Sequence, residues 1–263
     1  MGSRRICGRW NGSAWWLSRW RGVALARASV WRLLTGRLGW SLRRPRRQAV
    51  AWDESETARW VAHEWPRIKK GAVKKRAWIV FFDESGVSLL PEVRRTYAPR
   101  GRTPLLRHRL NWKPAGMAAT LGYHAADPER GPRLCFHLKP GSYGTSSLIE
   151  VLEQIRTFYA GESVVLVWDG LSAHWSRGVR AWVAGQEWLT LERLPAYAPE
   201  LNSVELLWSA IKTRELAHLA GDHLAYVADA AERGMHRVCS SEQLPWSFLA
   251  HTGLTIHPQT PQN

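Results

Sequence analysis

The sequence predicts an α/β protein with a mixed sheet flanked by helices, preceded by a small, basic, helical N-terminal region. Two apolar runs, WIVFF (78–82) and VVLVW (164–168), are each followed directly by an aspartate. Hairpin-like segments lie between the two runs, and helix and strand patterns alternate after residue 145. This order is typical of a mixed sheet with helices packed against it.

The basic N-terminal region holds much of the charge of the chain. Its first 50 residues contain twelve arginines and no acidic residue, within a chain of 263 residues whose net charge is +15. Cationic side chains neutralise phosphates and release condensed counterions, so this composition favours a double-stranded DNA partner. A basic tail without fixed structure and a coding bias that inflates Arg and Trp are the alternatives.

A short helix is expected within residues 22–50, with Ser29 as its N-cap and Gly36 near its end; its apolar face holds Val30, Leu33 and Leu34. The arginines that follow are too charged to pack and are interrupted by a proline, which predicts an extended arm. A helix followed by such an arm is typical of a helix-turn-helix with the arm along DNA. The residues expected to contact DNA in this region are Arg32, Arg43, Arg44, Arg46 and Arg47.

Residues 51–66 have the pattern of an amphipathic helix with acids in its first turns and an end near Pro66. The basic stretch 67–76 is expected to be a linker. The predicted organisation is therefore a helix-turn-helix-like region with its connecting helix (1–66), the linker, and an α/β domain (77–263).

Within the α/β domain, short β-type runs between residues 86 and 138 are separated by turn residues and predict hairpins. Residues 145–159 predict a helix, followed by a second helix around 175–185 and a strand over WLTLERL. The apolar stripe of the first helix consists of Leu148, Leu152, Ile155 and Tyr159.

The composition excludes several classes of protein. No apolar run approaches the roughly 18 to 20 residues that a membrane span needs, and no apolar segment of signal-peptide length follows the N-terminus, so a cytoplasmic location is expected. Cys7, Cys135 and Cys239 are far apart and odd in number. This predicts reduced thiols rather than a disulfide framework or a zinc site.

Three acids stand out against this background. Asp83 and Asp169 follow the two apolar runs, and Glu205 lies in a predicted helix after a proline-rich loop. Carboxylates at like ends of neighbouring strands can meet in the crevice where open α/β folds bind ligands. Each aspartate alone could instead open a turn, and Asn202 with Glu205 fits a capping box. The combination of all three acids with a basic N-terminal region favours a functional site.

Three segments, WIVFFDESG, VVLVWDGLSAH and LPAYAPELNSVELLWSAIK, resemble the signature blocks of DDE-superfamily transposases of the bacterial insertion-sequence branch related to mariner elements. The resemblance implies a ribonuclease-H-like core with Asp83, Asp169 and Glu205 as catalytic, metal-binding residues. It also implies two Mg²⁺ ions, for which Mn²⁺ can substitute. The implied activity is cleavage of duplex DNA at terminal inverted repeats and strand transfer into target DNA, typically at a TA dinucleotide, by a homodimer assembled on DNA.

This chemistry explains the residue types. Hard cations prefer oxygen ligands, and two ions about 3.5 to 4 Å apart can stabilise both the attacking and the leaving oxygen of a phosphodiester. Glu84 follows Asp83 in a predicted strand and so points to the opposite face, which gives it no metal-binding role. His174 stands where the family has a histidine and is expected to contact a DNA phosphate, with an inconsequential surface position as the alternative.

Further cations in the hairpin region are expected to follow the DNA backbone or to form a solvated face. They are Arg94, Arg95, Arg100, Arg102, Arg107, Arg109 and Lys113.

The main alternative function is a catalytically inactive DNA-binding remnant. Residues 1–21 lack the longer helical region with which such transposases usually begin, so a truncated copy is expected, and Gly170 stands where many relatives have asparagine. A glycosidase, in which paired carboxylates act as acid and nucleophile, is disfavoured by the positive charge.

Overall fold

The computed structural model describes residues 26–39, 53–88, 93, 105–106, 114–219 and 223–257. The chain divides into two compact units, residues 1–48 and 49–263. Within the described ranges, no helix is long and apolar enough to cross a membrane. Cys135 and Cys239 are free thiols, as expected, and Cys7 lies outside the described residues.

The described part of the first unit is helical. Helix α2 (Arg27–Arg32) continues into the π-helical turn η1 (Leu33–Arg37). Ser29 is therefore not the N-cap: its N–H already donates to the carbonyl of Ala26 at 2.9 Å, inside the first turn. The helix ends at Arg37, so the expected end near Gly36 is confirmed to within one residue. The helix-turn-helix stays a prediction.

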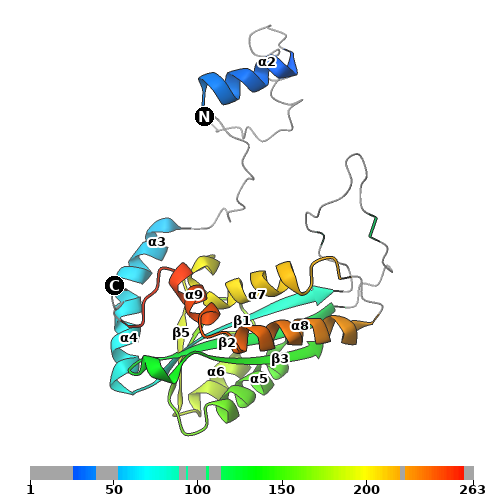
Figure 1. Cartoon of the computed structure of the whole chain (residues 1–263). Helices are drawn as coiled ribbons and strands as arrows, with labels where there is room; N and C mark the ends of the chain where they lie inside the picture. The colour runs from blue at the N-terminus through cyan, green and yellow to red at the C-terminus, as the bar shows by residue number, and fades with distance from the viewer. Residues whose placement is uncertain are drawn as a thin grey trace. The chain divides into compact units, whose positions relative to one another are not determined.

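A five-stranded mixed sheet forms the centre of the second unit (Figure 1). Its strands are β1 (Trp78–Ser88), β2 (Pro114–His124), β3 (Arg133–Pro140), β4 (Val164–Trp168) and β5 (Leu189–Arg193). Their order is β3-β2-β1-β4-β5, with β1, β2 and β3 antiparallel and with β4 and β5 parallel to β1. The predicted mixed sheet is confirmed, as is a hairpin of β2 and β3 around the short helix η3 (Pro128–Arg130).

The central strand, β1, begins with five fully buried residues, 78–82. Its side chains alternate between two apolar clusters, with Phe81 on one face and Phe82 on the other. The predicted stop at Asp83 is wrong, because the strand continues to Ser88. It does so because β2 pairs with β1 along its whole length, whereas the pairing with β4 ends at Phe81.

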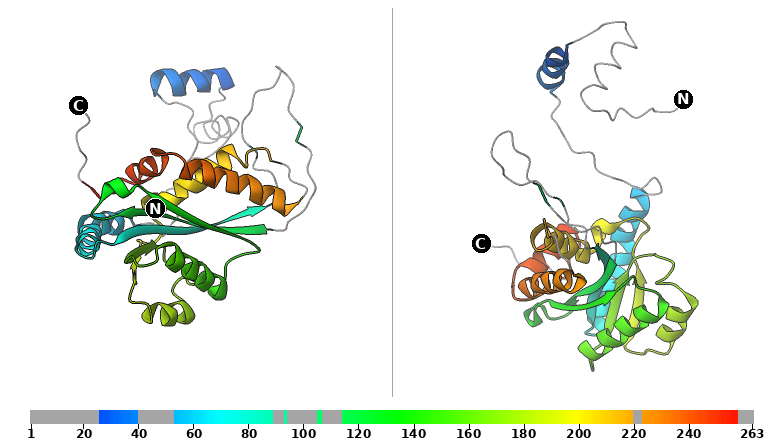
Figure 2. Two further views of the ribbon diagram at one scale, coloured as in Figure 1. Left: turned by 60° about the horizontal axis from the view of Figure 1, so that its bottom comes forward. Right: turned by 90° about the vertical axis from the view of Figure 1, so that its right-hand side faces the viewer.

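Helices cover both faces of the sheet (Figure 2). Helices α5 (Thr145–Phe158) and α6 (Arg177–Ala184) pack on the face of Phe82, close to the predicted bounds. The other face carries α4 (Trp65–Lys74), α7 (Ser203–Arg214), α8 (Leu224–Cys239) and α9 (Leu244–His251). The two apolar layers bury the sheet on both sides.

The helix expected to stop near Pro66 does not stop there. It begins as α3 (Glu54–Arg59) after the N-cap Asp53 and passes through the π turn η2 (Trp60–Glu64) into α4. Pro66 follows the π turn directly, at the second residue of α4. Residues 67–74, expected to be a linker, are therefore helical, and their inner face is buried against the sheet.

Candidate active site

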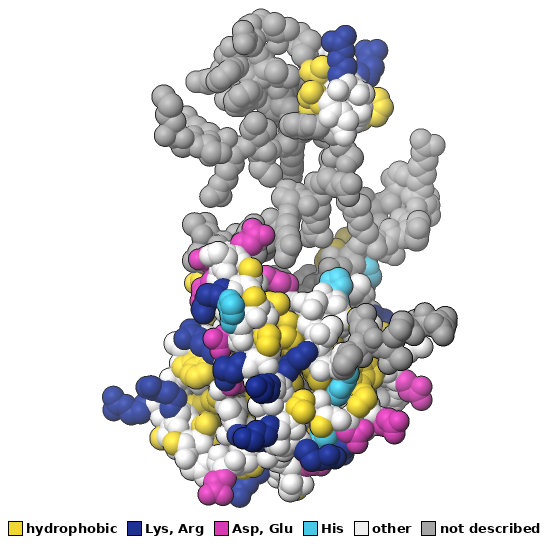
Figure 3. Space-filling model, turned by 90° about the vertical axis from the view of Figure 1, so that its left-hand side faces the viewer, with side chains coloured by type: hydrophobic (Ala, Val, Ile, Leu, Met, Phe, Trp, Pro, Cys, Tyr) yellow, Lys and Arg dark blue, Asp and Glu magenta, His cyan; other side chains and the backbone are white. Residues whose placement is uncertain are grey.

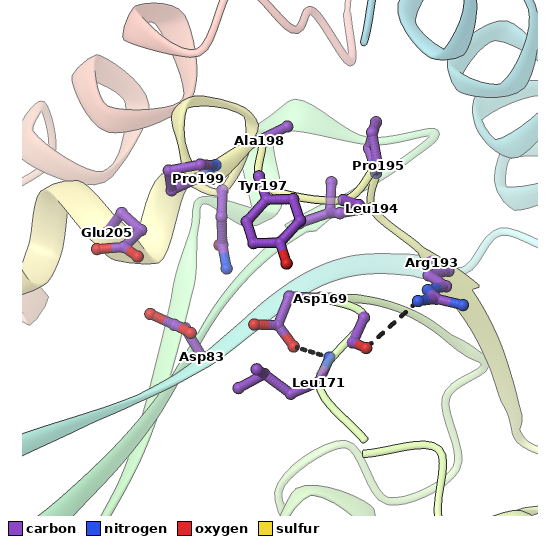
Figure 4. A pocket seen from close by; sticks show the side chains of 13 residues that line it. Asp83, Asp169, Leu171, Arg193, Leu194, Pro195, Tyr197, Ala198, Pro199 and Glu205 are labelled. Atoms are coloured by element: carbon purple, nitrogen blue, oxygen red, sulfur yellow. Dashed lines mark hydrogen bonds between the residues drawn. The ribbon is translucent and has the colours of Figure 1, made fainter. Parts of the chain in front are cut away.

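A pocket of about 360 Å³ lies at the C-terminal end of β4, beside β1 (Figure 4). It is lined by Asp83, Asp169, Gly170, Leu171, Arg193, Leu194, Pro195, Ala196, Tyr197, Ala198, Pro199, Asn202 and Glu205. The three acids singled out in the sequence therefore line one pocket, although they come from a strand, a loop and a helix.

The register of the sheet places the two aspartates. Phe81 and Val167 form the last parallel pair between β1 and β4, and both belong to the apolar cluster beneath α7. Asp83 and Asp169 each lie two residues further along their chains, on the same side. Neighbouring strands are about 4.8 Å apart, so the two carboxylates emerge beside each other. The two aspartates therefore face one crevice between neighbouring strands, as expected, although Asp83 lies within β1 rather than at its end.

Glu205 comes from the first turn of α7, which Asn202 ties to the sheet. The Asn202 side chain accepts a hydrogen bond from the N–H of Val204 at 3.1 Å, so it caps the helix. The capping box with Glu205 is wrong, because the N–H of Asn202 donates to the carbonyl of Pro199 at 3.0 Å. Its Nδ2 donates to the carbonyl of Phe82 at 3.0 Å, one residue before Asp83. This bridge sets the distance between the helix start and β1, and with it the place of Glu205 in the pocket.

Negative charge is buried together in this pocket. Asp83 is 8% exposed, and its Oδ2 accepts a hydrogen bond from Trp208 Nε1 at 2.8 Å. Burial, followed by repulsion from Glu205, raises the pKa of Asp83 to about 8, although the Trp208 bond opposes the rise. Burial also raises the pKa of Glu205, where Lys212 acts against it and Asp169 adds to it. A bound cation would relieve this repulsion.

Asp169 is held by the backbone and by a buried histidine. The N–H of Leu171 donates to its Oδ1 at 3.1 Å, and His174 Nδ1 lies 2.5 Å from the same oxygen. The other ring nitrogen, Nε2, lies 2.9 Å from Glu84 Oε2. Burial disfavours the charged imidazole, yet the two carboxylates raise the pKa of His174 to about 9. Burial likewise acts against ionisation of Asp169, but His174 and Leu171 outweigh it and lower the pKa of Asp169.

The structure contradicts one of the two expectations for His174. The side chain is 2% exposed and stacks on Trp168 at a centroid distance of 4.0 Å, so a surface position is wrong. Its two ring nitrogens face Asp169 and Glu84, and the contact with a phosphate stays a prediction. Glu84 lies on the opposite side of β1 from Asp83, as predicted.

Two polar residues of α7 were not identified from the sequence. Trp208 binds Asp83, and Lys212 Nζ donates to Ser85 Oγ at 2.6 Å. They follow Glu205 by three and seven residues, which is the spacing of one helix face. This spacing is the signal that could have identified them.

The edge of the pocket holds two further residues that the sequence did not single out. Arg193 Nη2 donates to the carbonyl of Gly170 at 3.3 Å, and its guanidinium fills the space that a side chain at position 170 would need. The guanidinium is the far end of a flexible side chain, so this contact does not by itself require glycine at position 170. Tyr197 is 60% exposed and has a φ of 58°, a left-handed conformation that is rare for an aromatic residue.

The other predicted DNA contacts are placed only in part. Arg32 is exposed at the end of α2, in the first unit. The remaining cations named above, Arg43, Arg44, Arg46, Arg47 and those of the hairpin region, lie outside the described residues. Within the described ranges, no group of three or more His, Cys, Asp or Glu side chains is arranged so that it could hold a metal ion as it stands.

A five-stranded mixed sheet of this order, with helices on both faces, defines a ribonuclease-H-like fold of the DDE nuclease type. The family model described as DDE superfamily endonuclease matches residues 78–223, which is more than half of the chain. The chain belongs to this family. No curated protein sequence matches it significantly.

Solved structures of the same fold include complexes of the Mos1 mariner transposase. The Mos1 paired-end complex with Mn is 16% identical, with a TM-score of 0.58 over 94% of this chain and 77% of that chain. The paired-end complex with the left transposon end is 17% identical, with a TM-score of 0.54 over 98% of this chain and 83% of that chain. The strand transfer complex is 16% identical, with a TM-score of 0.53 over 97% of this chain and 82% of that chain. At such identities the likeness is one of fold.

Proposed function

We propose that this protein is a transposase of the bacterial insertion-sequence branch related to mariner elements. It cuts DNA strands at terminal inverted repeats and joins the freed ends to target DNA. The observation that carries the proposal is the meeting of Asp83, Asp169 and Glu205 at one pocket. The fold they belong to is shared with Mos1 structures solved with transposon ends.

The residues of the pocket fit divalent metal ions. All three are carboxylates, the ligands that Mg²⁺ and Mn²⁺ prefer, and their mutual repulsion favours a cation among them. Trp208 and Leu171 each engage one oxygen of Asp83 and Asp169, respectively, which fixes the carboxylates and leaves their second oxygens for a ligand. Two bound ions would activate the attacking hydroxyl and stabilise the leaving oxygen. Mos1 itself was solved with Mn and with Mg.

The surrounding residues position these ligands and the DNA. Trp208 holds Asp83, and the buried pair of His174 and Glu84 holds Asp169. Arg193 lines the same pocket, where its guanidinium can bind a phosphate oxygen. The arginines of the N-terminal region hold the transposon ends, and two copies of the chain act together because two ends must be cut.

The test is strand cleavage of a duplex carrying the inverted repeats that flank the coding frame. With Mg²⁺ the wild-type protein should nick this duplex at the repeat end, and Asp169→Asn should abolish nicking while DNA binding remains. Asp229→Asn, which makes the same change at an exposed position of α8, is the control and should cut normally. Cleavage by Asp169→Asn at the wild-type rate would contradict the proposal.

A DNA-binding remnant without catalysis is the second candidate. It rests on the twelve arginines and the lack of acidic residues in positions 1–50, because such a region can bind duplex DNA without the pocket acids. In that case wild type and Asp169→Asn bind the duplex alike and neither cuts it.

A further inference from the structure

The outer face of α4 carries a row of cations. Its inner face is buried against the sheet, whereas Arg67, Lys70, Lys74 and Lys75 are all exposed. The first three recur at spacings of three and four residues, which puts them on one side of the helix. Figure 3 shows Lys and Arg side chains gathered on the side of the molecule where α4 lies in Figure 1.

Most of this charge is not neutralised within the unit. Arg67 is paired with Glu192 at 2.6 Å and with Glu64 at 2.8 Å. No carboxylate in the described ranges forms an ion pair with the three lysines. Cations in the last turn of a helix interact favourably with its dipole, which accounts for Lys74. It does not account for Lys70, which lies one turn earlier and repels Lys74.

Gly71 lies in the middle of these cations. Its neighbours one turn away along the helix are Arg67, Lys74 and Lys75. Glycine is a poor helix former, and an added β-carbon at this position would meet no atom within 4 Å. Nor does its φ lie in the left-handed region. Neither the helix nor its packing therefore requires glycine here, but its absent side chain lets another molecule approach the helix backbone closely.

We propose that the outer face of α4, consisting of Arg67, Lys70, Gly71 and Lys74, docks on the sugar-phosphate backbone of duplex DNA together with the C-cap residue Lys75, whose Nζ also donates to Thr190 Oγ1 at 3.3 Å. The proposed function supplies the identity of the polyanion. Lysines bind phosphates as point charges without reading bases, and a glycine between them allows close contact. Because α4 packs on β1 and β4, the strands that carry the aspartates, DNA on this face is held by the same unit as the pocket.

The salt dependence of DNA binding tests the lysines. Affinity for a mixed-sequence duplex is measured by fluorescence anisotropy at several salt concentrations, without divalent metal, in the full chain carrying Asp169→Asn. Combining Lys70→Gln, Lys74→Gln and Lys75→Gln should reduce the slope of log K against log salt by about 0.9 for each phosphate that these lysines neutralise.

The control removes the same charge elsewhere. Arg177→Gln, Arg180→Gln and Arg233→Gln together take three exposed cations from α6 and α8. This variant should leave the slope near that of the parent. Equal changes of slope in the two triple variants would overturn the proposal, because the α4 lysines would then contribute only net charge.

Gly71→Leu tests close docking without changing charge. Leucine is the better helix former, so Tm should stay level or rise, while DNA affinity should fall about tenfold. Unchanged affinity would overturn the proposal. Both tests measure DNA binding by a chain that carries Asp169→Asn and cannot cut. A negative result would therefore overturn DNA docking on α4 but not the proposed cleavage activity. Conversely, a wild-type protein that does not cut would not change these binding results.

Discussion

Replacing Trp208 with phenylalanine should weaken metal binding at the proposed carboxylate site more than it weakens the fold. The indole Nε1 donates to Asp83 Oδ2 at 2.8 Å, and both side chains are buried. Phenylalanine keeps an aromatic ring in the core but cannot donate, so Asp83 loses the bond that orients it and favours its ionised form. A hydrogen bond to a charged group contributes about 1.5–3 kcal/mol, so the Kd for Mn²⁺ should rise about 10- to 100-fold.

The measurement is calorimetric titration with Mn²⁺, alongside the Mg²⁺ dependence of cleavage. Trp65→Phe is the matched control, because Trp65 belongs to the same apolar cluster and donates to the carbonyl of Thr255 at 3.2 Å, away from the carboxylates. Both variants should lose comparable stability in urea, but only Trp208→Phe should lose metal affinity. Equal Mn²⁺ affinities in wild type and Trp208→Phe, or equal losses in both variants, would refute this reasoning.

Three further predictions concern groups around the sheet. Glu84→Gln removes the charge facing His174, so single-turnover cleavage should slow about tenfold while anisotropy finds DNA affinity unchanged; an unchanged rate would contradict this. Asn202→Ala removes a helix cap and a bond to β1, and urea denaturation should show a loss of about 2–4 kcal/mol. Arg130 lowers the pKa of Glu162, so their ion pair contributes stability above the unfolded pKa of about 4.3 and loses it as pH falls through the folded pKa. Glu162→Gln should therefore lower the free energy of unfolding by about 0.5–1 kcal/mol at neutral pH and by progressively less in acid. Urea denaturation at neutral pH and below the folded pKa of Glu162 measures the difference.

Strands buried on both faces were predictable where the apolar run and the strand coincide. In β4 all five residues are buried, so its end and the position of Asp169 follow from the run itself. In β1 the run ends at Phe82 but the strand continues to Ser88, because β2 pairs with it along its whole length. Residues 83–86 are not apolar, so the apolar run that predicts the strand stops before them. For this reason the sequence placed Asp83 at the end of the strand.

Contacts between distant segments were beyond local patterns. Trp208 and Asp83 are 125 residues apart, and no periodicity predicts their hydrogen bond. The same holds for Glu84, which meets His174 only because the loop after β4 folds back beneath β1. The helix through Pro66 was missed for another reason: a π turn before a proline has no sequence signature strong enough to outweigh the usual helix stop.

The three acids of the pocket are held by constraints of unequal strength, and this difference can be tested. Asp83 and Asp169 depend on the pairing of β1 with β4, which many backbone hydrogen bonds maintain. Glu205 depends on the bridge from Asn202 Nδ2 to the carbonyl of Phe82.

Serine at position 202 can cap α7 but is too short to reach that carbonyl. Asn202→Ser should therefore keep most of the helix stability, losing about half as much as Asn202→Ala, because the cap is retained. Its cleavage should fall about as far as that of Asn202→Ala, since both variants lack the bridge. Wild-type cleavage by Asn202→Ser would mean that the turn before α7, rather than the bridge, positions Glu205.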